Sequence, residues 1–357
     1  MRVPASRPPI RFRARLASAM VVTAFLAGCG GSAPSPALPV AAAAAMPSLG
    51  AAATTAAPSA ASAAASAADA ASSSAAPEPS PTALTLAWQK AAPNTGNTAT
   101  YWPAIDPTTG NVWVASPWEN HFWIFKPDGT FVERWGTAGS GNGQFHLTTH
   151  DQAHPDADGA VAFAPDGSFY VADGGNNRIQ QFDANRRFVR TWGSFGNGDG
   201  QFTSPKGIAT DGKTVFVADD FRGDMQTFDA TGKHLTTFTF PFILFSLMPN
   251  GNLLTMNQQF DPSGQRVKSL PVDFQAFGGN PSMAVADKAG NIYVGIQTDA
   301  DGAVGLVKLD PSGRVLGHWT TGAETLALSP DGTSMYMAYT GPPSGLGWPY
   351  LRKYTLP

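Results

Sequence analysis

Short runs of alternating apolar and polar residues fill the chain from residue 101 to residue 357. Two examples are residues 112–115 and 168–173, and each of these runs directly follows a turn that contains Gly. A side-chain period of two is that of half-buried β-strands, and the Gly, Pro, Asn and Asp residues between the runs favour tight turns. The pattern therefore predicts antiparallel hairpins rather than helices.

A unit of about four such strands recurs about six times. Its first half contains a marker glycine, at Gly110, Gly167, Gly212, Gly251, Gly290 and Gly332. Its second half opens with a large apolar residue, at Phe125, Phe182, Phe228, Phe260 and Leu309. Four strands every 40 to 50 residues or so are typical of a propeller blade, so the repeats predict an all-β, six-bladed β-propeller. The copy over residues 239–274 is the most degenerate, and its middle hairpin must be tight.

The last copy holds only three strands, at residues 325–329, 334–339 and 351–356. The run at residues 83–88 ends in Trp88, as the outer strands of other copies end in Trp135, Trp192 and Trp319. We therefore expect this N-terminal strand to complete the sixth blade and to remove an open seam of unpaired strand edges. The recurring Trp residues are expected to pack between blades.

Two copies carry more specific motifs. Gly200, Gln201 and Phe202 run into Ser204, Pro205, Gly207 and Ile208, and a hairpin joins Ala172 and Asp173 to Asn177, Arg178 and Ile179. These motifs resemble the NHL-repeat family, and the resemblance covers most of residues 83–357. It implies a six-bladed propeller, a fold that serves both binding modules and enzymes. Asp173, Asn176, Asn177 and Arg178 are expected to shape the hairpin, with Arg178 bracing a neighbouring blade.

The N-terminus is of a different kind. Five arginines precede an apolar run over residues 16–27, the order of a secretory signal peptide. Leu26 to Cys29 resembles a bacterial lipobox, which implies cleavage before Cys29 and its acylation; the alternative is an ordinary cleavage site with a chance Cys. The predicted organisation is a lipoprotein signal peptide (1–28), a low-complexity tether (29–82) and the NHL-type propeller (83–357).

The predicted tether is rich in Ala, Ser and Pro and has almost no charged or aromatic residues, so it cannot build a core. A coil of this length spans on the order of 40 Å. Two or more acyl chains anchor a protein stably, so we expect the chain to stay on a membrane of the bacterial cell envelope. Gly30, which follows the Cys, resembles the residue at this position in lipoproteins that are sorted to the outer membrane. We therefore expect the chain to lie on the outer membrane, facing the periplasm or the surface.

The charge of the chain excludes one class of partner. The formal net charge is −3, and without residues 1–28 there remain 18 basic and 26 acidic residues, a formal charge of −8. A negative domain does not attract nucleic-acid phosphates. Because Cys29 is the only Cys, the propeller has no disulfide, thiolate zinc site or Cys nucleophile.

Three of the six histidines, His146, His150 and His154, lie within nine residues. On a helix they would share one face and could bind zinc or calcium. The alternative is a polar surface loop, because Thr148 and Thr149 weaken a helix and Pro155 ends it. Apart from this possible metal, no cofactor is expected.

Enzymes with related propellers leave a second hypothesis open. The amidating lyases use histidines at positions where this chain has Lys206 and Ser282, and gluconolactonase-like propellers use an acid, Asn and Asp set for which no unambiguous counterparts exist here. We expect a binding or scaffolding module for a protein, peptide or carbohydrate, with a metal-dependent lyase or lactonase as the alternative. The residues expected at the rim of one propeller face are Trp118, His121, His150, His154, Arg222, Asp299 and Trp348.

Overall fold

A computed structural model of the chain describes residues 84–91, 101–148, 159–297, 304–321, 325–339 and 350–357. They lie in a compact unit over residues 72–357. Within these ranges the regular secondary structure is almost entirely strand, and no helix is long and apolar enough to span a membrane. The predicted signal peptide, the lipidation site Cys29 and the tether lie outside the described residues.

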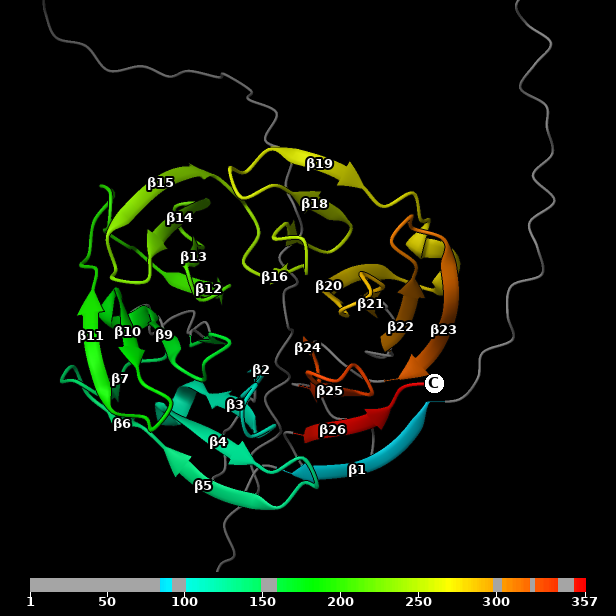
Figure 1. Ribbon diagram of the computed structural model, residues 1–357, viewed down its shortest axis with the longest axis horizontal. Helices are drawn as coiled ribbons and strands as arrows, with labels where there is room; N and C mark the ends of the chain where they lie inside the picture. The colour runs from blue at the N-terminus through cyan, green and yellow to red at the C-terminus, as the bar shows by residue number, and fades with distance from the viewer. Residues whose placement is uncertain (1–83, 92–100, 149–158, 298–303, 322–324, 340–349) are drawn as a thin grey trace, which may run out of the picture. The chain divides into compact units, whose positions relative to one another are not determined.

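Six four-stranded antiparallel sheets make up the unit, as the repeats predict (Figure 1). The first three blades are β2 (Tyr101–Ile105), β3 (Val112–Ser116), β4 (His121–Phe125) and β5 (Phe131–Trp135); β8 (Val161–Phe163), β9 (Phe169–Asp173), β10 (Arg178–Phe182) and β11 (Phe188–Trp192); and β12 (Pro205–Thr210), β13 (Thr214–Asp219), β14 (Asp224–Asp229) and β15 (His234–Thr239).

The other three blades are β16 (Ser246–Leu247), β17 (Leu253–Leu254), β18 (Gln258–Phe260) and β19 (Arg266–Ser269); β20 (Asn280–Ala286), β21 (Ile292–Gln297), β22 (Val304–Leu309) and β23 (Val315–Thr321); and β24 (Thr325–Leu328), β25 (Ser334–Tyr339), β26 (Tyr350–Thr355) and β1 (Thr85–Ala91). Shorter elements are β6 (Thr137–Ala138), β7 (Gln144–Phe145), η1 (Pro117–Glu119), η2 (Gly174–Asn176) and η3 (Phe274–Phe277).

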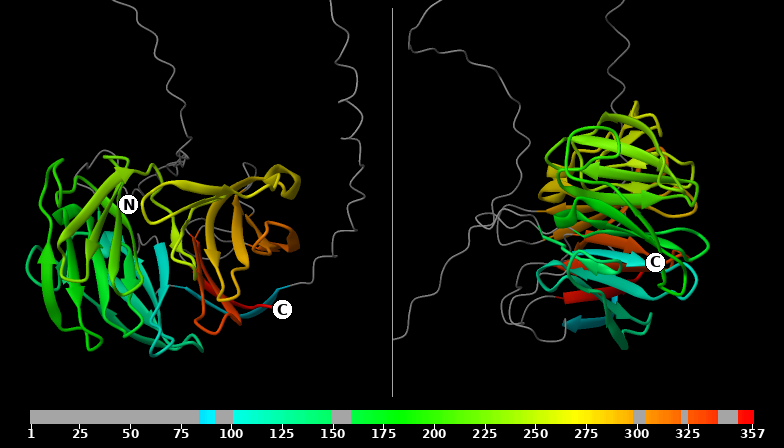
Figure 2. Two further views of the ribbon diagram at one scale, coloured as in Figure 1. Left: turned by 45° about the horizontal axis from the view of Figure 1, so that its top comes forward. Right: turned by 90° about the vertical axis from the view of Figure 1, so that its left-hand side faces the viewer.

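The innermost strands of the six blades form a closed ring. β2, β8, β12, β16, β20 and β24 each contact the next, and β24 contacts β2 (Figure 1). Viewed from the side, the sheets stand around a common axis (Figure 2). The six-bladed propeller is confirmed, and so is the degeneracy of blade four, whose first three strands span two or three residues each. Its middle hairpin is tight, because Thr255 N–H donates to Gln258 O at 2.9 Å.

The ring closes through the N-terminal strand. β1 pairs antiparallel with β26, as the outer strand of blade six, which confirms the expected closure. The indole N–H of Trp88 donates to Pro127 O in blade one at 3.0 Å, and its ring lies 5.9 Å from Tyr336. Arg352 Nε donates to Gln89 Oε1 at 2.8 Å across the pair. The closing strand therefore binds blade six to blade one as well as completing its own sheet.

The recurring Trp residues pack between blades. Trp135 of blade one lies 4.9 Å from Phe182 of blade two, and Trp192 of blade two lies 5.7 Å from Phe228 of blade three. Trp319 is buried in a cluster shared by blades five and six. Offset and edge-to-face aromatic pairs of this kind stabilise beyond their buried area. The prediction of a packing role is confirmed.

One face of the ring consists of short turns, each with an Asp or Asn near its start, and we call it the turn face. Asp229 Oδ1, for example, accepts the Thr231 N–H at 2.8 Å. In the turn at Asp331, hydrogen bonds from the Ser329 hydroxyl and the Thr333 N–H lower the pKa of the Asp331 carboxyl to about 2. In these turns the Asp side chains accept hydrogen bonds from backbone N–H groups that have no backbone partner. This explains why Asp recurs at these positions in the repeats.

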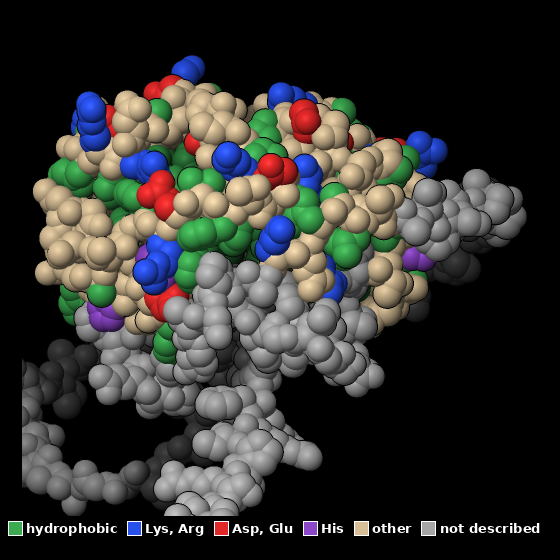
Figure 3. Space-filling model, turned by 90° about the horizontal axis from the view of Figure 1, so that it is seen from below, with side chains coloured by type: hydrophobic (Ala, Val, Ile, Leu, Met, Phe, Trp, Pro, Cys, Tyr) green, Lys and Arg blue, Asp and Glu red, His purple; other side chains and the backbone are tan. Residues whose placement is uncertain are grey.

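On the flank of the ring seen from below, basic and acidic side chains are interspersed with hydrophobic ones (Figure 3).

Candidate functional site

The face opposite the turns carries the longer connections, and we call it the loop face. In blade three, Pro205 pairs with Asp219, Asp219 with Asp224, and Asp224 with Thr239. The start of the inner strand, the middle hairpin and the end of the outer strand therefore lie at the same end of the blade. In blade one the same hairpin runs from Ser116 to His121. Of the residues predicted for the rim, those that the structure describes, Trp118, His121 and Arg222, belong to this face.

A cavity of about 240 Å³ lies on the propeller axis. All six inner strands contribute to its wall. The wall therefore also needs blade six, which carries the inner strand β24 and is completed by β1. Its lining consists of Trp102, Pro103, Ala160, Val161, Ala162, Phe163, Gly207, Ile208, Ala209, Thr210, Ile243, Phe245, Ser246, Leu247, Met283, Val285, Leu326 and Ala327.

The described lining of the cavity contains no Asp, Glu, His, Lys, Arg or Cys. Its two hydroxyls already donate within the protein, Thr210 Oγ1 to Thr214 O at 2.8 Å and Ser246 Oγ to Ala284 O at 2.9 Å. The side chains of the wall are therefore mostly apolar, and most of its polar surface comes from the backbone. Such a cavity favours an uncharged ligand, because a buried charge without a partner is costly.

At the loop-face end of the inner strand of blade three lies a basic side chain. Lys206 is buried, and its Nζ lies 2.6 Å from Asp220 Oδ2. The neighbouring Phe221 is 64% exposed, and Lys206 Nζ lies 5.8 Å from its ring centroid. This is the position at which the lyase resemblance would place a histidine. The amine is held in an ion pair there.

His121 lies inside the loop face rather than on an open rim. It is 5% exposed, its ring packs edge-on against Trp123 at 4.7 Å, and its Nδ1 lies 3.1 Å from Glu119 O. Burial lowers the pKa of His121, and the contacts with the Glu119 carbonyl and carboxylate oppose this.

The same hairpin brings a hydroxyl, a carboxylate and an imidazole together. Glu119 Oε2 accepts from Ser116 Oγ at 3.1 Å and lies 3.1 Å from His121 Nε2, which makes no hydrogen bond of good geometry. In a nucleophilic triad the imidazole stands between hydroxyl and carboxylate. Here the carboxylate stands between the other two, so this order does not activate the Ser116 hydroxyl. The cluster fixes the hairpin in which Asn120 takes a left-handed backbone.

Two Gly-rich loops on the loop face are each braced by an arginine. The Arg178 guanidinium donates to Ser140 O, Gly141 O and Gln144 O at 2.7 to 3.0 Å, and its Nε donates to Asp173 at 2.7 Å. The bracing role predicted for Arg178 is confirmed.

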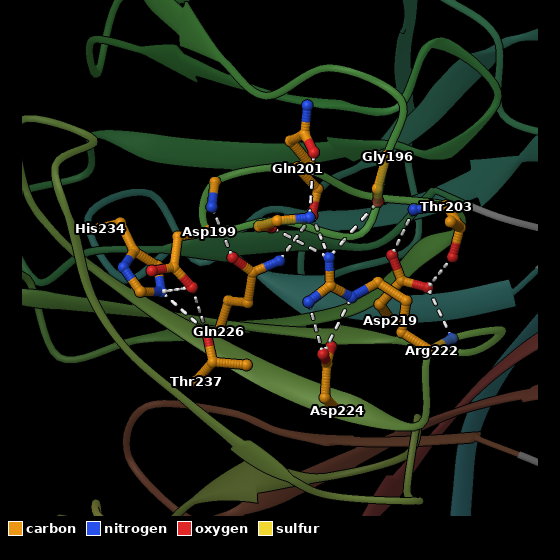
Figure 4. Close-up of polar contacts among 12 residues, drawn as sticks. Gly196, Asp199, Gln201, Thr203, Asp219, Arg222, Asp224, Gln226, His234 and Thr237 are labelled. Atoms are coloured by element: carbon orange, nitrogen blue, oxygen red, sulfur yellow. Dashed lines mark hydrogen bonds and ion pairs between the residues drawn. The ribbon is translucent and has the colours of Figure 1, made fainter. Parts of the chain in front are cut away.

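Arg222 does the same for the next loop (Figure 4). Its Nη1 donates to Gly198 O and Gln201 O at 3.0 Å each, and its other nitrogens hold Asp224. Its side chain is 8% exposed. The structure thus places Arg222, which was expected at a binding rim, in a brace that leaves little of it for a ligand.

The candidate metal ligands are only partly described. His146 follows β7 in an extended segment, not in a helix; its N–H donates to Asp173 Oδ1 at 2.7 Å and its carbonyl accepts from Gly175. His150 and His154 lie outside the described residues, as do the rim residues Asp299 and Trp348. Within the described ranges, no three His, Cys, Asp or Glu side chains are grouped as a metal site. Trp118 lies in η1 and is 41% exposed, as expected of it.

The cavity was not predicted from the sequence, although a signal for it exists. The inner strands carry mostly uncharged residues, for example at residues 160–164, 282–286 and 325–328, with Lys206 of β12 as an exception. A ring of such strands around an axis implies an uncharged channel. Trp102 gives no comparable signal, because its place in the wall depends on an unusual backbone angle.

The comparisons with known proteins agree with the fold. Residues 158–182, which include β8 to β10, match the NHL repeat family. A gluconolactonase from Xanthomonas campestris is similar with a TM-score of 0.51 and 14% identity, over 77% of this chain and 89% of that one. A virginiamycin B lyase from Staphylococcus aureus has a TM-score of 0.48 and 13% identity, over 76% and 99%. No curated protein sequence matches this chain. At these identities the likeness concerns the fold alone.

Proposed function

We propose that this chain, a six-bladed β-propeller with an NHL repeat, is a lipid-anchored binding module of the bacterial cell envelope that holds a small uncharged molecule in its axial channel. The observation that carries the proposal is the cavity of about 240 Å³, whose described side chains are mostly apolar and carry no charge. A wall of this composition supplies binding energy through burial of apolar surface. It supplies no general acid, base or nucleophile from its described residues.

The rim of the loop face supports a peptide or carbohydrate partner less strongly. Of its seven predicted residues, Trp118 is exposed, whereas His121 and Arg222 are buried in contacts of their own. The exposed aromatics Phe195 and Phe221 belong to connections of the same face. A partner on this face would therefore bind beside a channel mouth, and the channel itself is the better-defined site.

The binding role is tested on the full chain purified from the membrane fraction. We expect denaturation of the protein to release one uncharged compound, which mass spectrometry should detect at about one molecule per chain. Ala327 lies in the cavity wall opposite blade three. The larger side chain of Ala327→Leu would fill part of the cavity and should reduce the yield of this compound several-fold. Equal yields from both proteins, or no compound, would contradict a channel ligand. Stoichiometric zinc or calcium that is lost in a His150→Ala, His154→Ala double variant would instead support the metal-dependent lyase or lactonase.

The anchor is tested separately. Because Cys29 is the only Cys, a Cys29→Ala variant removes every acylation site of this kind. We expect the variant to move from the membrane fraction to the soluble envelope fraction, while the wild type stays on the membrane. Retention of the variant on the membrane would contradict lipid anchoring, and Cys29→Ser serves as a second, more conservative variant.

A further inference from the structure

The outer flank of the ring where blades six and one meet is basic. It consists of β1, β26 and residues 121–135, and we call it the basic flank. Its basic residues are Lys90, Lys126, Arg134, Arg352 and Lys353, and its acidic residues are Asp128 and Glu133. Their formal charge is +3, whereas the chain without residues 1–28 has a formal charge of −8. The flank therefore differs in sign from the rest of the protein.

Three of these cations meet at one outer turn of blade one, residues 126–130. Lys353 Nζ of blade six donates to Pro127 O at 3.1 Å. A Cβ built on Gly129 would lie 2.8 Å from Cε of Lys90, so the Lys90 side chain also reaches this turn. The first residue of the turn is itself an exposed lysine. Ammonium groups from two blades are thus gathered at one seam.

The charge of the basic flank is not neutralised within the described part of the chain. There, none of the cations Lys90, Arg134 and Lys353 forms an ion pair with a carboxylate. Glu133, by contrast, is paired with Arg186 of blade two. The cations of the flank therefore remain available to an anionic partner.

Apolar side chains lie among these cations (Figure 3). The guanidinium of Arg134 lies over the ring of Trp123, at 5.8 Å from the centroid. Phe131 lies 5.6 Å from the same Trp and is 43% exposed. Basic and exposed apolar groups together are typical of surfaces that bind membranes, because the cations meet lipid phosphates while the apolar groups enter the headgroup region.

We propose that the basic flank docks on an anionic lipid surface. Its cations contact headgroup phosphates, and Phe131 enters the headgroup layer. This inference rests on the lipid anchor of the proposed function, because it states how the anchored propeller lies on its membrane. The flank is a side of the ring, so docking leaves the loop face and the turn face both open to solution (Figure 1).

The position of the flank in the chain favours a lipid partner over other anions. The predicted tether, residues 29–82, leads directly into β1, which is itself part of the flank. A coil on the order of 40 Å would hold the flank near the lipid and so raise its effective concentration there. The net negative charge of the protein does not prevent this, because charges beyond a Debye length of about 10 Å are screened.

The test uses the full chain purified from the membrane fraction and reconstituted into vesicles. One set of vesicles contains only phosphatidylcholine, and the other contains 30% phosphatidylglycerol. Thr130→Cys places an NBD fluorophore on the turn of the flank, since the acylated Cys29 does not react. We expect the NBD fluorescence to rise with the anionic lipid at 0.1 M salt. The rise should disappear at 1 M salt, where the Debye length is about 3 Å.

A double variant, Lys90→Gln with Arg134→Gln, removes two exposed charges of the flank. It should reduce the ratio of docked to undocked molecules roughly ten- to thirtyfold, about fivefold for each cation. Lys213→Gln with Lys288→Gln is the matched control, because it removes two exposed charges from turns of blades three and five. The control should leave the ratio within twofold of the wild type, and thermal melting should show that both variants are folded.

Flotation of the wild type with the neutral vesicles reports the anchor separately. If the protein floats with them but the NBD signal is the same in both lipids, the docking is wrong and the anchor stands. Equal effects of the two double variants would also overturn the docking, because they would reflect net charge alone. Flotation only with anionic vesicles, lost in the flank variant and not in the control, would support the docking and contradict the anchor. Flotation with neither would contradict both.

Discussion

At the scale of single residues, the glycines of the turn face show how closely neighbouring blades approach. Gly232 has a φ of +84°, and a Cβ there would lie 2.7 Å from the ring of Trp192 in the preceding blade. Gly251 has the same φ of +84° but no atom within 4 Å of such a Cβ. Comparing substitutions at Gly232 and Gly251 therefore distinguishes the cost of backbone strain from the cost of packing against the next blade.

We expect Gly232→Ala to lower the free energy of unfolding by about 2 to 4 kcal/mol, because backbone strain of about 1 to 2 kcal/mol adds to overpacking against Trp192. Gly251→Ala should cost only about 1 to 2 kcal/mol, the backbone part alone. Urea denaturation followed by Trp fluorescence measures both. Equal losses in the two variants would mean that the Trp192 ring moves aside freely.

His121 should make stability depend on pH. Its folded-state pKa is lowered, first of all by burial, so below about pH 6.5, the ordinary His value, the unfolded chain binds more protons than the folded one. Stability is then complete above pH 6.5 and falls as the pH decreases below it. Glu119 and Arg134 face the ring and act in opposite directions on it.

We expect His121→Gln to flatten the decrease in melting temperature between pH 7 and pH 5 relative to the wild type. His234, which is more exposed and lies near Thr237 and Asp199, provides the comparison through His234→Gln. An unchanged pH profile in His121→Gln would show that the imidazole stays solvated enough to protonate in the folded state.

At the scale of elements, the two braced loops share the pattern Gly-x-Gly-x-Gly-Gln-Phe, but the arginines that brace them stand at different positions of their hairpins. In the hairpin of blade two Arg178 opens β10, whereas in blade three Arg222 precedes β14 and Asp224 opens it. Asn176 Nδ2 donates to Gly139 O, as Arg222 Nη1 contacts Gly196 O. Arg222 thus takes the place of Asn176, and Asp224 takes the place of Arg178, while both guanidinium groups still hold a Gly-rich loop.

Arg222→Lys should loosen residues 196–202 specifically. A lysine cannot reproduce the planar set of donors that reaches Gly198 O, Gln201 O and Asp224 together, and the loss is about 2 to 3 kcal/mol. We expect faster amide hydrogen exchange over residues 196–202, with the Arg178-braced loop at residues 139–145 unchanged as an internal control. Equal acceleration of both loops would indicate global destabilisation instead.

The sequence predicts the elements well and the site poorly, for a physical reason. Strand periodicity and turn residues are properties of short stretches of sequence. The blades, the degenerate copy and the closing strand can therefore be predicted from the sequence. Whether Arg222 faces a ligand or a neighbouring loop depends on residues some 20 positions away, such as Gln201. The left-handed backbone of Trp102 is likewise encoded by no local pattern.

At the scale of the whole molecule, ring closure decides stability. A chain truncated to start at residue 101 lacks β1, leaves β26 as an open edge, and loses the Trp88 contact with Pro127. We expect it to aggregate or to melt without cooperativity, because an exposed strand edge pairs with other chains.

A chain that starts at residue 83 retains β1 and should melt as the full chain does, in differential scanning calorimetry. Cooperative melting of the shorter chain at the same temperature would refute the closing role of β1. Trp88→Ala in the full chain gives an intermediate case, in which the strand is present but its contact with blade one is lost.

The pairing of β1 with β26 also fixes the order of events as the chain is made. Gln89 and Arg352, which meet across this pair, are 263 residues apart in sequence. β1 is the first of the described strands to be synthesised, and its partner β26 is the last. Contacts of such separation form slowly, and the ring cannot close before β26 has been made. The protein therefore keeps its ring open until the last of the described strands has been made.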